Sequence, residues 1–422
     1  MREMKDSGIE WIKQIPTRWS TTRGKNILQL MRRPPEADDE VITCFRDGEV
    51  TLRRNRRKEG FTFSDKEIGY QGIKKGDLII HGMDGFAGAI GISDSDGKGS
   101  PVLVVCTTKE NTRYLMYYLR TLAMQDVFLA LATGIRERSC DLRWNKIADL
   151  LFPVPELNEQ CRIADYLDRK CSQIDAIIAR QQEVIEKLKA YKLAVITEAV
   201  TKGLNPDVPM KDSGVEWIGE IPEHWVLNKL KYLSLDIGDG IHATPTYDED
   251  GNVYFVNGNN IGEEYLVFKE DTNTISDTEY ASYKLPLLTG NTVFVTLNGA
   301  TYGKISFYHG EKILLGKSAG FITLKSTESR EFIRYYLQSY TAKLIMDLSL
   351  LGSTIANLSL RTLRDFVIPY PPIEEQIQIV NHLNNRTSSI DAAVSKKEKI
   401  VDELIDYKES LIYEVVTGKK EV

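Results

Sequence analysis

Several features that define common protein classes are scarce in this 422-residue chain. Its five cysteines form no CxxC pair and are too few to staple a chain of this length with disulfides. Its five histidines show no metal-ligand spacing, which argues against a structural zinc site. No stretch approaches the ~20 apolar residues that span a bilayer, and residues 1–20 lack the apolar core of a signal peptide. We therefore expect a cytoplasmic protein of several domains that binds no metal.

The recognised catalytic motifs are missing as well. The chain has no Gly-x-x-x-x-Gly-Lys-Ser/Thr phosphate loop, no Gly-x-Ser-x-Gly elbow and no Asn/Asp-Pro-Pro-Tyr/Phe tetrapeptide. The nearest glycine cluster, Gly82 to Gly88, does not have the spacing of a dinucleotide-binding turn. The net charge of −6 excludes a uniformly basic nucleic-acid-binding protein but is compatible with local basic patches.

The chain contains an internal repeat. MKDSGIEWIKQIPTRW at 4–19 returns as MKDSGVEWIGEIPEHW at 210–225, with eleven of the sixteen positions identical. FPVPELNEQCRIADYL at 152–167 returns as IPYPPIEEQIQIVNHL at 368–383, at an offset of 216 residues. Two repeated segments in the same order indicate that the chain consists of two halves built on one plan.

Each half has a variable region of mixed character between its repeated segments. Short apolar runs bounded by glycine predict strands at 77–81, 101–106 and 291–296. Longer runs at 113–131 and 330–348 predict helices. Prolines then favour extended backbone and end each region: Pro153, Pro155, Pro369, Pro371 and Pro372.

A long helix is predicted after each group of prolines, at about 158–201 and 374–417. Apolar residues recur there at heptad spacing for over four heptads, which indicates a coiled coil between the two helices. Two independent amphipathic surface helices are the alternative. Gln181 and Lys397 occupy the same seam position and either fix the register or face solvent. The other seam positions are Ala164, Leu167, Cys171, Ile174, Ile178, Ile185, Leu188 and Val195, with Val380, Leu383, Thr387, Ile390, Val394, Val401, Leu404 and Leu411.

Two segments open these helices, Pro155-Glu-Leu-Asn-Glu159-Gln160 and Pro371-Pro-Ile-Glu-Glu375-Gln376. Together with the duplicated WIxxIPxxW segments and the two variable regions, they resemble the specificity subunits of type I restriction–modification systems over essentially the whole chain. The resemblance implies that each variable region is a target recognition domain for one half of a split DNA sequence. It also implies an antiparallel coiled coil that sets the gap and docks two modification subunits, which carry the S-adenosylmethionine site. Restriction subunits can join such a complex, and this chain itself would be non-catalytic and bind no cofactor.

The implied fold class is α+β. Two mixed α/β target recognition domains are separated by a long antiparallel two-helix coiled coil, in a pseudo-twofold internal repeat. The two recognition domains share few landmarks beyond glycines such as Gly76 and Gly290, so the target is expected to be asymmetric. The expected divisions are an N-terminal repeat segment at 1–19, recognition domain 1 at 20–156, a central helix at 157–203, a linker with the second repeat segment at 204–225, recognition domain 2 at 226–372 and a C-terminal helix at 373–422.

In the first recognition domain the strongest candidate for phosphate binding is a run of basic residues, since cations on a DNA-binding module bind phosphate. A solvated charged loop is the alternative. A glycine-led loop before the proline stop adds two arginines, and the glycine cluster adds further candidates. These residues are Arg53, Arg54, Arg56, Arg57 and Lys58, then Arg136 and Arg138, then His81, Asp84 and Phe86.

The second recognition domain offers polar loops. Asn can bond bidentately to adenine, and Lys can bond to guanine or phosphate. Asn-Gly is equally a signature of tight turns, so turn formation is the alternative for each Asn. The candidates are His242, Thr244, Asn257, Asn259, Asn260, Asn298, Thr301, Tyr302, Lys304 and Asn357.

The leading hypothesis is therefore a DNA-recognition subunit that binds double-stranded DNA and modification subunits. Two rival hypotheses remain. One is a coiled-coil scaffold that binds only proteins, against which the basic run and the divergence of the two variable regions argue. The other is a self-sufficient nuclease or methyltransferase with unfamiliar motifs.

Overall fold

The computed structural model describes residues 2–56, 68–130, 142–299, 301–349 and 357–422. The chain divides into two compact units, the first made of two chain segments and the second of one continuous segment. The first unit comprises residues 1–182 and 398–422, and the second comprises residues 183–397. Four candidates from the sequence lie outside the described residues: Arg57, Lys58, Arg136 and Arg138.

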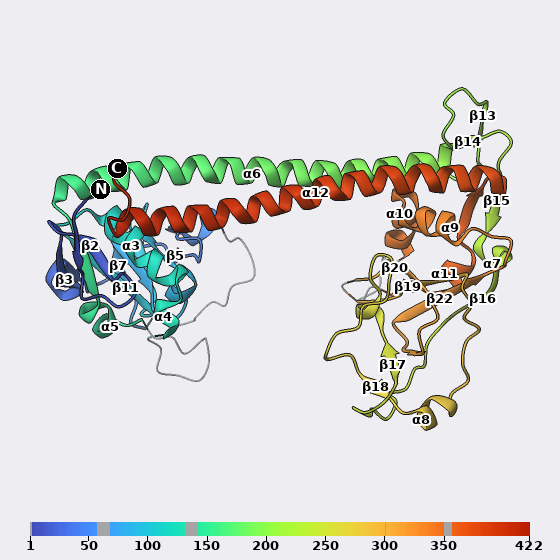
Figure 1. Cartoon of the computed structure of the whole chain (residues 1–422), viewed down its shortest axis with the longest axis horizontal. Helices are drawn as coiled ribbons and strands as arrows, with labels where there is room; N and C mark the ends of the chain where they lie inside the picture. Colours follow the sequence, from blue (N-terminus) through green and yellow to red (C-terminus); the bar gives the residue numbers. More distant parts are fainter. Residues whose placement is uncertain (1, 57–67, 131–141, 300, 350–356) are drawn as a thin grey trace. The chain divides into compact units, whose positions relative to one another are not determined.

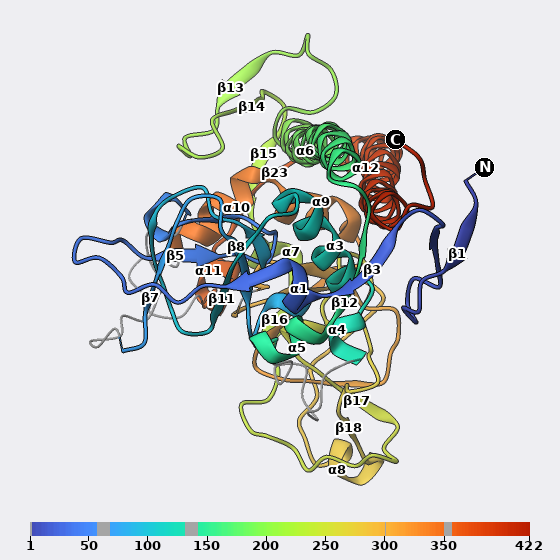
Figure 2. The same cartoon turned by 90° about the vertical axis from the view of Figure 1, so that its left-hand side faces the viewer.

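Two long helices, α6 (Leu157–Lys202) and α12 (Ile373–Val416), contribute to both units. Their bounds agree within one residue with the predicted 158–201 and 374–417. They lie side by side (Figures 1 and 2), and every predicted seam residue is buried or half-buried, including Gln181 and Lys397. The predicted apolar seam is thus confirmed.

The two helices are antiparallel. In the first unit Lys408 Nζ donates to Asp175 Oδ1 at 2.6 Å, and in the second Lys192 Nζ donates to Asp391 Oδ1 at 2.7 Å. Residues of increasing number along α6 therefore pair with residues of decreasing number along α12. The two ion pairs are also equivalent under the repeat, since each Lys and each Asp has its counterpart 216 residues away.

The first unit is built around a four-stranded antiparallel sheet in the order β4-β11-β8-β9. Helix α3 packs between this sheet and α6, so Tyr114, Leu115 and Leu119 share one core with Ile163 and Leu167. The elements before α6 are β1 Met4–Asp6, β2 Gln14–Pro16, β3 Ser20–Arg23, α1 Gly24–Ile27, β4 Leu28–Leu30, β5 Ile42–Cys44, β6 Val50–Leu52, α2 Arg53–Arg56, β7 Gln71–Ile73, β8 Leu78–His81, η1 Gly85–Ala87, β9 Ile90–Ile92, β10 Gly97–Gly99, β11 Leu103–Thr108, α3 Thr112–Met124, α4 Val127–Ala130, α5 Trp144–Asp149 and β12 Leu151–Val154.

The second unit repeats this plan with the sheet order β16-β22-β19-β20, again fully antiparallel. Its core joins Phe332, Ile333 and Tyr336 of α9 to Ile379 and Leu383 of α12. The elements before α12 are β13 Met210–Asp212, β14 Glu220–Pro222, β15 Val226–Lys229, α7 Leu230–Leu233, β16 Ser234–Asp239, β17 Val253–Val256, η3 Gly258–Asn260, β18 Thr274–Ile275, α8 Asp277–Ala281, β19 Thr292–Thr296, β20 Ile305–Phe307, β21 Ile313–Leu315, β22 Ala319–Leu324, α9 Arg330–Gln338, α10 Tyr340–Ser349, α11 Leu360–Arg364 and β23 Val367–Tyr370.

The shared sheet makes the two units more alike than their sequences indicate. Glycine landmarks are equivalent in the two units: Gly88 and Gly303 both have positive φ and lie two residues before the first residue of β9 and of β20. The domains differ in their smaller sheets. The first unit has the pairs β5-β6 and β7-β10, whereas the second has the three-stranded sheet β18-β17-β21. The common sheet is a framework, and the divergence is concentrated in what surrounds it.

Two predicted helices are interrupted. The expected helix at 113–131 is α3 followed by α4, because Asp126 between them adopts positive φ. The expected helix at 330–348 is α9 followed by α10, because Ser339 is extended, with φ −66° and ψ 159°. The predicted strands correspond to β8, β11 and β19, with ends displaced by at most two residues.

Candidate nucleic-acid interface

The described part of the basic run forms the short helix α2 at the end of hairpin β5-β6. Arg54 pairs with Glu40 at 2.5 Å, and Arg56 pairs with Asp47 at 2.6 Å and Glu49 at 2.9 Å. The hydrogen bond from Arg56 lowers the pKa of Asp47 below its usual value. Arg53 is half-buried, and its Nε lies 3.4 Å from Thr43 Oγ1.

These ion pairs do not disqualify the arginines as phosphate ligands. Exposed ion pairs contribute only about 0–1 kcal/mol, so a phosphate can compete for the guanidinium groups. The acidic partners nevertheless offset part of the local positive charge. The helix α2 is therefore a weaker electrostatic feature than its sequence indicates.

Two further arginines reach the same hairpin and were missed by the sequence reasoning. Arg120 of α3 donates to the carbonyl oxygen of Asp47 at 2.5 Å, while the carboxylate of the same Asp47 holds Arg56. Arg46, in the β5-β6 turn, pairs with Asp84 at 2.8 Å. The Arg-Asp-Gly turn was visible in the sequence as a signal for Arg46, but only the fold brings Arg120 to the hairpin.

The glycine-cluster candidates of the first unit have structural partners. His81 Nδ1 accepts the Asp84 backbone N–H at 3.0 Å, and burial lowers the pKa of His81, so the ring is neutral at pH 7. Phe86 is half-buried and packs against the main core. Asp84 is held by Arg46. His81, Asp84 and Phe86 thus each have a partner within the protein, and none of these side chains is free to read a base.

In the second unit, the three asparagines of the turn after β17 differ in their contacts. Asn257 and Asn260 cap each other around η3: Asn260 Oδ1 accepts the Asn257 backbone N–H at 2.9 Å. Asn260 is buried and also donates to the carbonyl oxygen of Val267 at 3.1 Å. Asn259, between them, has an exposed side chain. The turn interpretation holds for Asn257 and Asn260, and Asn259 is the one of the three with an exposed side chain.

The other polar loops of the second unit meet this turn. Thr301 Oγ1 donates to the Gly258 carbonyl oxygen at 3.4 Å, and Asn298 forms a β-bridge with Asn357. Lys304 and Asn357 are exposed, whereas Tyr302 packs against the core. One edge of the second unit thus gathers Asn259, Asn298, Thr301, Lys304 and Asn357.

The remaining two candidates, His242 and Thr244, follow strand β16. His242 Nε2 lies 2.9 Å from Asp239 Oδ2, and both His242 and Thr244 are exposed. The loop is tied to β21 by the Ile241 backbone N–H, which donates to the Leu315 carbonyl oxygen at 2.8 Å. These side chains therefore form a second exposed polar group beside the same three-stranded sheet.

The repeated Glu-Gln motifs are structural. Gln160 and Gln376 each donate to the carbonyl oxygen of the proline five residues earlier, at 2.9 and 3.0 Å. Glu375 accepts from Trp225 Nε1 at 3.0 Å, and Glu159 pairs with Arg2 at 2.7 Å. The motif joins the repeated N-terminal segment of each half to the start of a long helix, which explains why the segments recur together.

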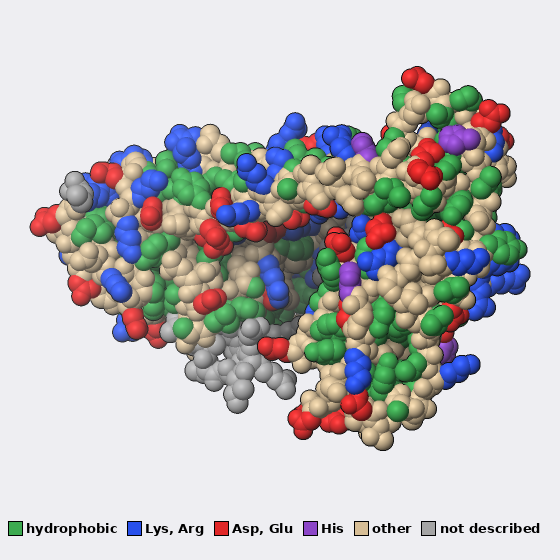
Figure 3. Space-filling view, turned by 45° about the vertical axis from the view of Figure 1, so that its right-hand side comes forward, with side chains coloured by type: hydrophobic (Ala, Val, Ile, Leu, Met, Phe, Trp, Pro, Cys, Tyr) green, Lys and Arg blue, Asp and Glu red, His purple; other side chains and the backbone are tan. Residues whose placement is uncertain are grey.

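Charge over the visible surface is mixed, with basic and acidic side chains interspersed (Figure 3). Within the described ranges, no group of three or more His, Cys, Asp or Glu residues is arranged to hold a metal ion. A membrane-crossing helix is also absent from that part of the chain, since none combines sufficient length and hydropathy.

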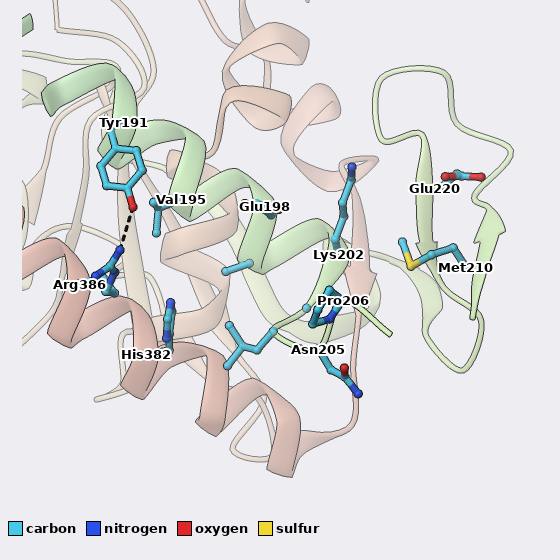
Figure 4. A pocket seen from close by; sticks show the side chains of 13 residues that line it. Tyr191, Val195, Glu198, Lys202, Asn205, Pro206, Met210, Glu220, His382 and Arg386 are labelled. Atoms are coloured by element: carbon cyan, nitrogen blue, oxygen red, sulfur yellow. Dashed lines mark hydrogen bonds between the residues drawn. The ribbon is translucent and has the colours of Figure 1, made fainter. Parts of the chain in front are cut away.

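A polar hollow of about 660 Å³ lies beside the long helices in the second unit (Figure 4). Tyr191 of α6 and Arg386 of α12 face each other across it, and Arg386 Nη2 donates to Tyr191 Oη at 2.8 Å. His382, Glu198 and Lys202 contribute to the lining. The hollow is open and combines aromatic, basic and acidic groups, which suits contact with another macromolecule.

Comparisons with known proteins agree with this architecture. Residues 238–401 match the family model described as the type I restriction modification DNA specificity domain. The chain is 25% identical to the putative type I restriction enzyme MjaX specificity subunit of Methanocaldococcus jannaschii, over 97% of this chain and 95% of that protein. It is 24% identical to the MjaVIII specificity subunit of the same organism, over 96% of this chain and 94% of that protein.

Solved structures share the fold. A chain from a structural study of complex assembly in a type I R-M system has a TM-score of 0.70 at 15% identity, covering 96% of this chain and 99% of that chain. The HsdS subunit of Thermoanaerobacter tengcongensis has a TM-score of 0.51 at 17% identity, covering 96% and 98%. With the duplicated architecture and the matched DNA specificity domain, these similarities support a specificity subunit of a type I restriction–modification system.

Proposed function

We propose that this chain provides sequence-specific DNA recognition to a type I restriction–modification enzyme, with each unit reading one half of a bipartite, asymmetric target. One observation carries the proposal. The two units share a four-stranded sheet of the same strand order but differ in the small sheets and loops around it. Two similar frameworks with different surfaces are suited to bind two similar DNA segments of different sequence. A scaffold that binds only proteins is not favoured, because the matched family is a DNA specificity domain.

An exchange of one recognition domain tests this proposal. Residues 226–372 begin at β15 and end after β23, and these two strands pair with each other. The first and last strands of this domain are therefore neighbours, so the domain is joined to the rest of the chain at one place. Replacing it with the matching region of another specificity subunit should change one half of the methylated target and preserve the other. Sequencing of methylated sites in host DNA measures the outcome, and a change in both halves would refute the modular reading.

The long helices are the proposed docking surface for two modification subunits. Exposed apolar side chains occur on them in pairs that the repeat relates. Leu157 and Ile373 are 51% and 39% exposed, and Tyr191 and Tyr407 are 47% and 52% exposed. Exposed apolar groups at equivalent positions support two equivalent sites for the same partner. Tyr191→Ala with Tyr407→Ala should reduce modification-subunit binding in pull-down or ultracentrifugation assays, while single substitutions should leave one site.

We assign the chemistry to the partners. In this proposal the modification subunits hold S-adenosylmethionine, restriction subunits join the same complex, and this chain contributes recognition without catalysis or a cofactor of its own. The purified chain, incubated with DNA and either S-adenosylmethionine or magnesium, should neither methylate nor cleave. Activity that co-purifies with the chain and is abolished by a substitution in it would contradict this assignment.

The paired helices are also the proposed determinant of the gap between half-sites. One heptad inserted after Ala190 and another after Asp406 preserves the seam and adds ~10 Å of helix at 1.5 Å per residue. The preferred gap should then lengthen by about three base pairs, at ~3.4 Å per base pair. Methylation of a library with fixed half-sites and variable gaps reports the preference. An unchanged gap would show that the helices do not set it.

A further inference from the structure

The second unit contains a basic hollow of about 260 Å³ between α6 and the loops that carry its base-reading candidates. Lys189, Lys192, Leu193 and Ile196 form one wall, at the i, i+3, i+4, i+7 spacing of a single helix face. The opposite wall includes Gly303 and Lys304. Three lysine side chains from two separate elements thus converge on one space.

The loops opposite the helix continue directly from the polar edge of the second unit. Gly262 and Glu263, which line the hollow, follow the η3 turn that carries the exposed Asn259. Gly303, which also lines it, lies two residues after Thr301. DNA held by that edge would therefore extend onto the face of α6. From this continuity and the converging lysines, we propose that the hollow binds a backbone phosphate of the target duplex, so that α6 contacts DNA directly in addition to pairing with α12. The inference rests on the proposed function of the second unit in DNA recognition.

The charges around the hollow allow a phosphate to bind. Lys189 pairs with Glu186 at 3.5 Å across exposed helix surface, an interaction weak enough for phosphate to compete with. Lys192 is half-buried, and its ion pair with Asp391 holds its side chain in place at the wall of the hollow while the ammonium group stays charged. Lys304 is exposed and lines the hollow from the loop before β20. Glu263 also lines the hollow and opposes an anion, but its side chain is exposed and can turn toward solvent.

The repeat offers an internal comparison. At the positions equivalent to Lys189 and Lys304, the first unit has Ile405 and the buried Ala89. The counterpart of Lys192 is Lys408, which is paired with Asp175. The basic hollow is therefore a feature of the second half of the repeat, and the phosphate contact is expected beside the half-site that the second unit reads.

The test compares charge-removing variants in the assembled complex with modification subunits. Lys189→Gln with Lys304→Gln should reduce the log–log salt slope of DNA binding by about 0.9 for each phosphate that is no longer neutralised. The methylated sequence should stay the same, because phosphate contacts carry no sequence information directly. Ethylation of phosphates beside the second half-site should inhibit the parental complex more than the variant. Glu263→Gln should strengthen binding by removing the opposing charge.

Lys187→Gln provides the matched control for the Lys189 part of the double variant. It removes the same charge from the same helix, but its position two residues away turns its side chain about 200° around α6 from Lys189, onto the opposite face. Equal reductions of the salt slope by Lys187→Gln and by Lys189→Gln alone would overturn the inference. Failure of a folded double variant to bind modification subunits would also overturn it, since the hollow would then receive protein. A parental complex without any target preference would instead refute the proposed function itself.

Discussion

Two neighbouring asparagines in the second unit should respond in opposite ways to the same substitution. Asn259 is exposed at the η3 turn, whereas Asn260 is 6% exposed and bonded on both sides of its amide. Replacement by Ala removes the same chemical group at both positions. The surroundings then decide whether DNA recognition or stability is lost.

The expected magnitudes follow from these contacts. Asn260→Ala leaves the Asn257 backbone N–H and the Val267 carbonyl oxygen without their partner. At about 1–3 kcal/mol for each of these two groups left unsatisfied, the free energy of unfolding should fall by about 2–6 kcal/mol. Asn259→Ala should change it by less than about 0.5 kcal/mol, as is usual for surface positions. If Asn259 reads a base, its removal should cost about 1–3 kcal/mol of discrimination at one target position.

Thermal or denaturant unfolding of each variant measures the first effect. Binding of the assembled complex to targets randomised in one half-site at a time measures the second, and about 1–3 kcal/mol corresponds to roughly 5- to 150-fold in affinity. The change should be confined to the half-site read by the second unit. An Asn259→Ala variant with unchanged preference at every position would refute its assignment to base reading. Destabilisation by Asn259→Ala equal to that by Asn260→Ala would refute the division of roles.

Three further predictions concern other parts of the molecule. Arg54→Ala with Arg56→Ala should flatten the salt dependence of DNA binding by less than ~0.9 per residue, because acidic partners already offset these charges; isotherms at several salt concentrations check this, and the full decrease would contradict it. Cys106 is buried, and burial raises its pKa to about 12, so iodoacetamide at about pH 8 should leave it unmodified in the folded protein; rapid labelling seen by mass spectrometry would contradict its burial. Lys192→Asp should lower the free energy of unfolding by up to ~1 kcal/mol, and adding Asp391→Lys should restore most of it; no recovery in the double variant would argue against the ion pair.

The long helices were predictable from the sequence because their signals are local and repeated. Heptad spacing identified the seam, and the proline groups marked the start of each helix within one residue. The interruptions at Asp126 and Ser339 were missed, since the apolar pattern continues across both positions. Hydrophobic periodicity reports which face is buried more reliably than whether the backbone is continuous.

The common sheet and the roles of the candidate residues depend on contacts that sequence spacing does not contain. Strands of the same order in the two units share few identical residues, because a buried strand requires apolar character rather than a particular side chain. Asn257 and Asn259 have the same chemistry in the sequence, but only folding makes one a cap and leaves the other exposed. Likewise, the acidic partners of Arg56 come from the preceding turn.

The pairing of the first and last strands of each recognition domain has a consequence for how such genes can diversify. Strand β3 pairs with β12, and β15 pairs with β23, so each domain begins and ends on one two-stranded ribbon. The segments flanking these ribbons, 4–19 and 210–225, are nearly the same in both halves. A genetic crossover within such a segment would transfer an intact domain together with its attachment strands, without dividing a sheet. A new pairing of half-sites could then arise in one recombination event, with no need for gradual change at individual contacts.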